Sequence, residues 1–211
     1  MFEGKEKFVV AAVVLAVVGG SAYWYYAVKQ KKDQQRAVAA LLGDTTAQLR
    51  KALAAPPAPD MLPRIDGNLK AARAPRDKPL ADAAGHYIHG AREIVRRCAD
   101  AERLSREAAM SRRALAMHMA AAAGRDSYWI RIASDLKKRV ERDHHELDVS
   151  LKALSELLYM LPETQKELAP HVDASLLLEE SERQRARERA MEAAKRAAEE
   201  LEKVRRLAQP R

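Results

Sequence analysis

The chain has 211 residues, of which 32% are charged and only 5% are aromatic, and its formal net charge is +8. This length allows one modest domain, and a composition rich in Ala, Leu, Arg and Glu is typical of long helices. Eight Gly and nine Pro are too few for a turn-rich β fold, and a single cysteine, Cys98, excludes an intramolecular disulfide framework.

Residues 8–28 form the one long run without a charge, FVVAAVVLAVVGGSAYWYYAV. As a helix this run rises about 31 Å, which matches a hydrocarbon core of about 30 Å. The sequence therefore predicts a single transmembrane helix that follows a short tail over residues 1–7. A cleaved signal peptide is the alternative, because Lys5 and Lys7 precede the apolar run and Gly20-Ser21-Ala22 offers small residues for cleavage.

The C-terminal end of the run carries the residue types expected at a membrane surface. Aromatic rings prefer the headgroup level, and Lys and Arg attract anionic lipid. Residues 29–78 hold eleven Lys/Arg against five Asp, so the basic excess lies next to the predicted span. We expect anionic headgroups as a partner, and the predicted membrane-interface residues are Tyr23, Trp24, Tyr25, Tyr26, Lys29, Lys31, Lys32 and Arg36.

The same region supports two further expectations. More Lys and Arg follow the span than precede it, and the positive-inside rule then favours an inner-membrane protein whose soluble part is cytoplasmic rather than periplasmic. Ala12, Ala16 and Gly20 recur at every fourth position. Small residues at this spacing let a second membrane helix approach closely, so they are a candidate helix–helix interface.

Residues 29–55 are predicted to be a basic juxtamembrane helical segment, interrupted at Gly43. Pro56, Pro57 and Pro59 stop this segment, since proline neither donates a backbone hydrogen bond nor fits a helix interior. With further prolines at 63 and 75, residues 56–78 are interpreted as a Pro-rich linker.

From residue 79 to residue 211 the pattern is that of an antiparallel helical bundle or coiled coil. Apolar residues recur at three- and four-residue spacings over about 79–123, 127–161 and 172–208, with breaks at the intervening turn and at two prolines. The predicted fold class is therefore all-α: one N-terminal transmembrane helix plus this bundle, which ends in a long charged helix.

The last predicted helix keeps only a narrow apolar stripe among many Glu and Arg residues. Such a helix cannot bury enough apolar surface by itself. We therefore expect it to contact another protein or a second copy of the chain, through Ala190, Ala197, Leu201 and Val204.

Candidate chemical sites are few. Asp143-His144-His145-Glu146 is the densest group of possible metal ligands, but it lacks metal-site spacing and is interpreted as a solvated, salt-bridged patch. Cys98 lies on an apolar stripe and is interpreted as buried and inert. The chain contains no P-loop, no GxSxG and no CxxC motif, so we expect no enzyme, cofactor or metal. Aromatic residues are not interleaved with the Arg pairs, which makes nucleic acid an unexpected partner.

These features predict a single-pass, membrane-anchored helical scaffold or adaptor that mediates protein–protein interaction or assembly at the membrane. A membrane-anchored sensor is one alternative, with a ligand pocket near His118, Tyr128 or Trp129. An envelope-spanning coiled-coil protein is another alternative. The order of segments in this chain, an anchor followed by a charged helical region, is similar to that of phage lysis proteins. Membrane topology distinguishes the envelope-spanning protein from the cytoplasmic scaffold.

Overall fold

The computed structural model describes the backbone of residues 3–121 and 127–207 and the side chains of residues 24–121 and 127–206. Within these ranges the chain is all-helical, which confirms the predicted all-α class and the helical bundle. The elements are α1 (Glu3–Ala54), α2 (Met61–Ala72), α3 (Lys78–Ala120), α4 (Ser127–Leu168), the 3-10 turn η1 (Ala174–Leu176) and α5 (Glu180–Leu207).

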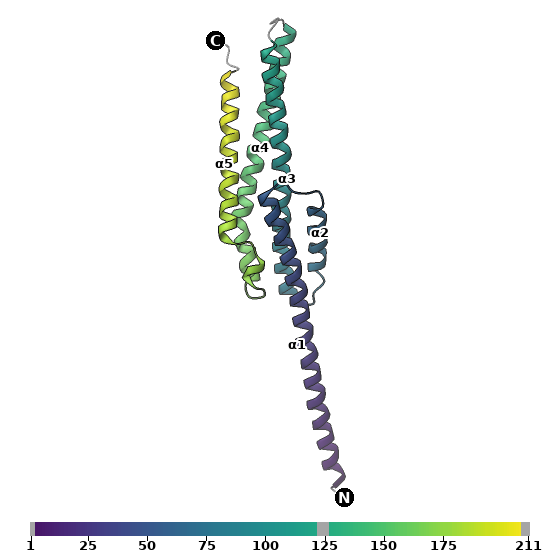
Figure 1. The fold of residues 1–211 in the computed structure, drawn as a ribbon. Coiled ribbons are helices and arrows are strands. Elements are labelled where there is room, and N and C mark those ends of the chain that lie inside the picture. The colour runs from purple at the N-terminus through teal and green to yellow at the C-terminus, as the bar shows by residue number, and fades with distance from the viewer. Residues whose placement is uncertain (1–2, 122–126, 208–211) are drawn as a thin grey trace.

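The helices form an elongated bundle built on the antiparallel hairpin of α3 and α4 (Figure 1). Helix α5 packs along α4, while the C-terminal part of α1 and the short helix α2 pack against α3. The N-terminal part of α1 projects away from the bundle, at the end opposite to the α3–α4 turn (Figure 1).

The main core lies where α1 enters the bundle. Val38 is the first buried residue of α1 among its described side chains, and the core continues through Leu42 and Leu49. These residues pack with side chains of α2, α3, α4 and the start of α5 in one apolar cluster. Full burial of such side chains contributes about 1.5–3 kcal/mol each, so residues 38–54 of α1 are part of the bundle core.

Helix α1 continues through Gly43, where the sequence predicted an interruption. Glycine costs about 1 kcal/mol in a helix interior, but the neighbouring Leu42 is fully buried in the core. Burial of the flanking residues offsets the glycine penalty. Residues 29–42 and the first bundle helix are therefore parts of one unbroken helix.

The predicted linker contains an ordered helix. Residues 61–72 form α2, which buries Met61, Ile65 and Ala72 against α1 and α3. Pro63 is tolerated because it lies in the first turn, where backbone N–H groups have no partner within the helix. Only residues 55–60 and 73–77 remain as connections between helices.

Two other boundaries differ from the predicted ones. Helix α4 runs to Leu168 and contains Pro162, at which the sequence predicted a break. The proline removes one helical hydrogen bond, but Leu161 and Leu168 on either side are buried in the core and hold the last turns in place. Helix α5 begins at Glu180 rather than near 172, since η1 precedes it. The predicted helix ends at 123 and 208 lie outside the described residues.

Across the described side chains, no helix carries a stretch that is both long and apolar enough to cross a membrane. The backbone of residues 8–28 is helical as part of α1. Residues 8–22 of the predicted span, including Ala12, Ala16 and Gly20, lie outside the described side chains, as does Tyr23.

Candidate functional site

The projecting part of α1 carries the described members of the predicted membrane-interface set. Side chains from residue 24 to residue 37 are exposed or half-buried, and none is buried. Trp24, Tyr25 and Tyr26 are 69%, 62% and 72% exposed. The basic residues that follow them are also exposed, namely Lys29, Lys31, Lys32 and Arg36. These side chains therefore lie clear of the bundle and are available to a surface outside it.

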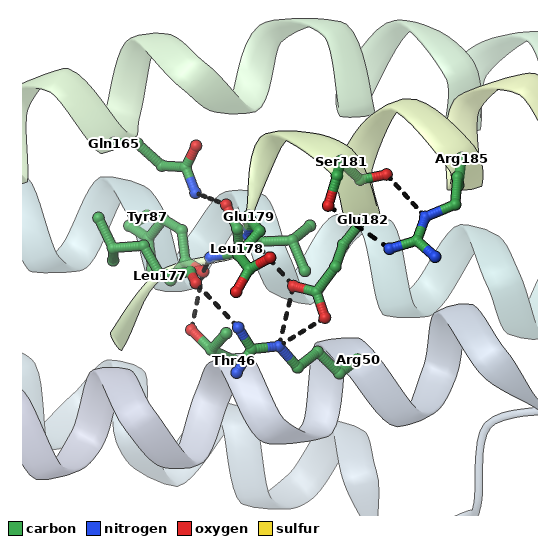
Figure 2. Close-up of polar contacts among 10 residues, drawn as sticks. All are labelled: Thr46, Arg50, Tyr87, Gln165, Leu177, Leu178, Glu179, Ser181, Glu182 and Arg185. Carbon is green, nitrogen blue, oxygen red and sulfur yellow. Dashed lines mark hydrogen bonds and ion pairs between the residues drawn. The ribbon is translucent and has the colours of Figure 1, made fainter. Parts of the chain in front are cut away.

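Polar side chains connect α1 to the bundle in a junction that Figure 2 shows. We define the junction as Thr46, Arg50, Tyr87, Gln165, Leu177, Leu178 and Glu182. Tyr87 of α3 is fully buried, and its hydroxyl lies 2.8 Å from Thr46 Oγ1 of α1. The same hydroxyl accepts a hydrogen bond, at 3.3 Å, from the backbone N–H of Leu178. Burial raises the pKa of Tyr87, so the phenol stays neutral while it joins three segments.

A charged pair completes the junction on its more exposed side. Arg50 Nε of α1 donates to both carboxylate oxygens of Glu182 in α5, each at 3.0 Å, and Arg50 Nη2 donates to the Leu177 carbonyl at 3.2 Å. Glu182 also accepts from the backbone N–H of Glu179 at 3.1 Å, which caps the first turn of α5. Charge-assisted contacts of this kind are about twice as strong as neutral ones.

The pKa of Glu182 reflects these contacts. Desolvation by burial raises it, but the hydrogen bonds from Arg50 and from the Glu179 N–H, together with the arginine charge, outweigh that effect and hold the pKa below its ordinary value of 4.5. The carboxylate is thus ionised in the folded chain across the neutral range.

Helix α4 fixes the same connection from its other side. Gln165 Nε2 donates to the Leu178 carbonyl at 2.8 Å (Figure 2), and Gln165 Oε1 accepts from Arg183 at 3.0 Å. The chain segment that leads into α5 is therefore bound by α1, α3 and α4 at once. The junction therefore holds these helices together.

An open groove of about 660 Å³ lies beyond the C-terminal end of α1. Small residues such as Ala101 and Ser105 of α3 and Ala193 of α5 line it, with Leu151 of α4 at its base. Cys98 also lines the groove, and burial raises the pKa of its thiol to about 12. The interpretation of Cys98 as an inert residue agrees with this value, since the reactive thiolate is not formed at neutral pH.

Charged pairs border the groove. Arg112 of α3 contacts Glu200 of α5 at 2.6 Å, and Glu192 and Arg196 pair along α5. The groove therefore has an apolar, small-residue wall and a rim whose charges balance. Its volume lies in the range of small-ligand sites, which is about 300–1,000 Å³.

The acidic–histidine cluster on α4 is partly buried, whereas the sequence predicted a solvated patch. Asp143 and His144 are each only 5% exposed. Asp143 pairs with Arg139 and Arg142, and His144 Nδ1 lies 3.0 Å from the carbonyl of Val140. Both residues face the bundle because they lie on the same side of α4 as its other buried residues. In the described part of the chain no group of three or more His, Cys, Asp or Glu is placed to hold a metal ion.

The apolar stripe of α5 is covered by the chain itself. Ala190, Ala197 and Val204 are buried and Leu201 is half-buried, and α5 packs along α4. The stripe is thus used within one chain, and its contact with a partner stays a prediction.

The sequence did not single out the junction residues. Tyr87 was one of few aromatic residues in the predicted bundle, which was a usable signal for a core position. Thr46, Arg50 and Glu182 gave no such signal, because their roles depend on contacts between residues as far apart as 50 and 182.

The fold and the junction define an all-helical bundle that is continuous with a projecting N-terminal helix. Comparison with protein-family models, with curated proteins and with solved structures finds no match for the chain.

Proposed function

We propose that the chain is a single-pass inner-membrane scaffold whose helical bundle is held at the cytoplasmic face by α1. The observation that carries this proposal is the continuity of α1. Its residues 24–37 project with exposed aromatic and basic side chains, and its residues 38–54 are part of the bundle core. The uncharged run over 8–28 supports the membrane part of the proposal, since its helical length matches the bilayer.

The proposed role is structural rather than catalytic. A helix that is continuous from a bilayer into a domain core fixes both the height and the orientation of the domain. The bundle then presents its outer faces to another protein, or to a second copy, at a defined place above the membrane, while Lys29, Lys31 and Lys32 contact anionic headgroups.

Membrane fractionation of the full chain tests the anchor. Leu15→Arg and Val18→Arg place charges in the middle of the run, where each costs about 2.5–3.5 kcal/mol. We expect the wild type to resist carbonate extraction and the double variant to be extracted. Val149→Arg is the matched control, because Val149 is 50% exposed on the bundle. A double variant that resists extraction as the wild type does would contradict the anchor.

Reporter fusions after Arg211 test the orientation. A reporter that works only in the cytoplasm is expected to be active, and one that works only outside the inner membrane is expected to be silent. The reverse result would place the bundle outside the cytoplasm and would favour the envelope-spanning alternative.

The groove favours a sensor as the second candidate function. It is large enough for a small elongated apolar ligand, and Cys98 lies in its wall. The sequence predicted a pocket near His118 and Trp129. Their two rings stack with centroids 4.9 Å apart, which closes the space between them. A ligand in the groove is expected to slow the reaction of Cys98 with a thiol reagent under mildly denaturing conditions. A reaction rate that stays unchanged with every ligand tried would count against a sensor.

A further inference from the structure

The turn end of the α3–α4 hairpin exposes an unusual set of side chains. We call residues 110–121 and 127–139 the hairpin tip. Ser111 and Val140 are buried, but between them no described side chain is buried. The exposed apolar residues of the tip are Met110, Met117, Met119, Tyr128 and Ile130, which are 61%, 65%, 46%, 61% and 57% exposed. These exposed apolar side chains, gathered at one end of the hairpin, are available for contact with a protein or a membrane.

The tip is preformed rather than loose. The rings of His118 in α3 and Trp129 in α4 stack at 4.9 Å with an interplanar angle of 21°. His118 Nε2 also lies 3.0 Å from the Trp129 carbonyl. These contacts join the two helices beside the exposed apolar residues, so those residues are presented on a fixed support.

The tip is basic. Its described residues include six Lys/Arg and one Asp, and three of the basic residues pair with carboxylates outside the tip, namely Arg112, Lys137 and Arg139. Arg113 and Lys138 are exposed, and neither has an ion pair within the described part of the chain. The Arg131 guanidinium lies over the Tyr128 ring, 5.5 Å from its centroid, which keeps that charge next to an exposed apolar side chain. Exposed apolar residues with adjacent Lys and Arg complement an anionic lipid surface.

The size of the tip also favours a lipid surface over a protein. Two helices side by side, each about 10–12 Å across, present a face of about 400 Å² over about 18 Å of length. A stable protein interface buries about 800 Å² on each partner. Shallow insertion into a bilayer needs no such area, because every inserted side chain leaves water regardless of its neighbours.

We propose that the hairpin tip binds the surface of an anionic lipid bilayer. The tip lies at the opposite end of the molecule from the projecting part of α1, and the end of the hairpin extends past the last described turn of α5 (Figure 1). The bilayer at the tip is therefore a different stretch of membrane from the one that α1 enters. This bridging step rests on the proposed anchor, whereas lipid binding by the tip does not.

Vesicle clustering with the full chain tests the proposal. Donor vesicles of phosphatidylcholine carry the inserted chain, and acceptor vesicles contain phosphatidylcholine alone or a mixture with phosphatidylglycerol. Light scattering and transfer of a lipid dye between the two sets report clustering. We expect clustering with the anionic acceptors and not with the neutral ones, and we expect it to weaken as salt is added.

Variants locate the contact. Arg113→Gln with Arg131→Gln is expected to weaken acceptor binding at least about tenfold, because each basic residue near an anionic surface adds to the attraction. Met117→Ser with Ile130→Ser is expected to weaken it similarly. The matched control is Met160→Ser with Met191→Ser, two residues that are 64% and 54% exposed away from the tip. The control is expected to cluster as the wild type does.

Three outcomes would overturn the proposal: no preference for anionic acceptors, tip variants that cluster like the wild type, or clustering that requires the chain in both vesicle sets. The last outcome would show a contact between two protein tips. Failure of the anchor gives a different result. In that case the chain does not stay with the donor vesicles. It still floats with the anionic acceptor vesicles, and the tip variants abolish this flotation.

Discussion

At the scale of single residues, the Tyr87 hydroxyl is the point at which three segments meet. It lies on α3, contacts Thr46 of α1 and accepts from the N–H of Leu178 ahead of α5. A buried backbone N–H without an acceptor costs about 1–3 kcal/mol, so this single oxygen stabilises the approach of α5 to the rest of the bundle.

Tyr87→Phe is expected to lower the free energy of unfolding by about 1–3 kcal/mol, because Leu178 N–H then has no acceptor. Chemical denaturation of the full chain in detergent, followed by circular dichroism, measures the change. Tyr159→Phe is the control, since Tyr159 is 67% exposed, and its effect should stay within about 0.5 kcal/mol. Equal effects of the two substitutions would show that the buried hydroxyl contributes no more to the free energy of unfolding than the exposed one.

The depressed pKa of Glu182 predicts a pH dependence of stability. A carboxyl whose folded-state pKa lies below its unfolded value of 4.5 contributes stability above that value and loses it as pH falls through the folded-state pKa. We expect the free energy of unfolding to fall with acidification below 4.5, and we expect a shallower fall in Glu182→Gln. Glu163→Gln, at a 73% exposed side chain, should keep the wild-type profile. Parallel profiles for all three proteins would contradict the assignment.

Single residues were the hardest part to predict from the sequence. Apolar periodicity indicated that Leu154 and Leu158 face a core, and both are buried. It could not indicate that Asp143 and His144 are buried beside them, because a charged residue on an apolar seam can also turn outward. The Arg50–Glu182 pair joins residues 132 positions apart, and no local pattern encodes such a distance.

At the scale of elements, α1 is the helix that departs most from its sequence signals. Gly43 suggested two separate pieces, yet the structure contains one helix of 52 residues. Tertiary packing decides this, because the apolar residues around Gly43 find partners in α3 and η1. In the same way, core contacts hold the last turns of α4 despite Pro162.

Gly43→Ala is expected to stabilise the chain by about 0.5–1 kcal/mol, the usual gain from replacing glycine in a helix interior. Space is available, since a Cβ at this position would lie 3.6 Å from Leu176 Cδ2, an ordinary van der Waals contact. Gly43→Pro should cost about 3 kcal/mol or more. Thermal unfolding of both variants measures the difference, and a destabilising alanine would show that α1 is not continuous at this point.

At the scale of the whole molecule, the chain is long rather than round. Helix α1 alone spans about 78 Å and α3 about 65 Å at the standard helical rise, and their axes run along the same long bundle (Figure 1). The sequence predicted the helices of the hairpin and their antiparallel order. It could not predict that α1 would extend from inside the bundle to far outside it, since that length depends on the unbroken passage through Gly43.

Neutron scattering from the full chain in contrast-matched detergent is expected to give a maximum dimension above about 78 Å, the length of α1. A compact globule of this chain length would have a radius of gyration of about 17 Å, and the measured value should exceed it clearly. A scattering profile of a compact particle would mean that the projecting part of α1 folds back on the bundle.

The unbroken α1 has a geometric consequence for any assembly around the proposed anchor. Each residue of a helix turns the chain by about 100° and raises it by about 1.5 Å. One residue inserted between Lys29 and Arg36 would therefore rotate the whole bundle by about 100°, a little over a quarter of a turn, around the membrane normal. Seven inserted residues, close to two full turns, would return it to nearly its original azimuth about 10 Å higher. The count of residues in this short stretch thus sets which face of the bundle each neighbour meets.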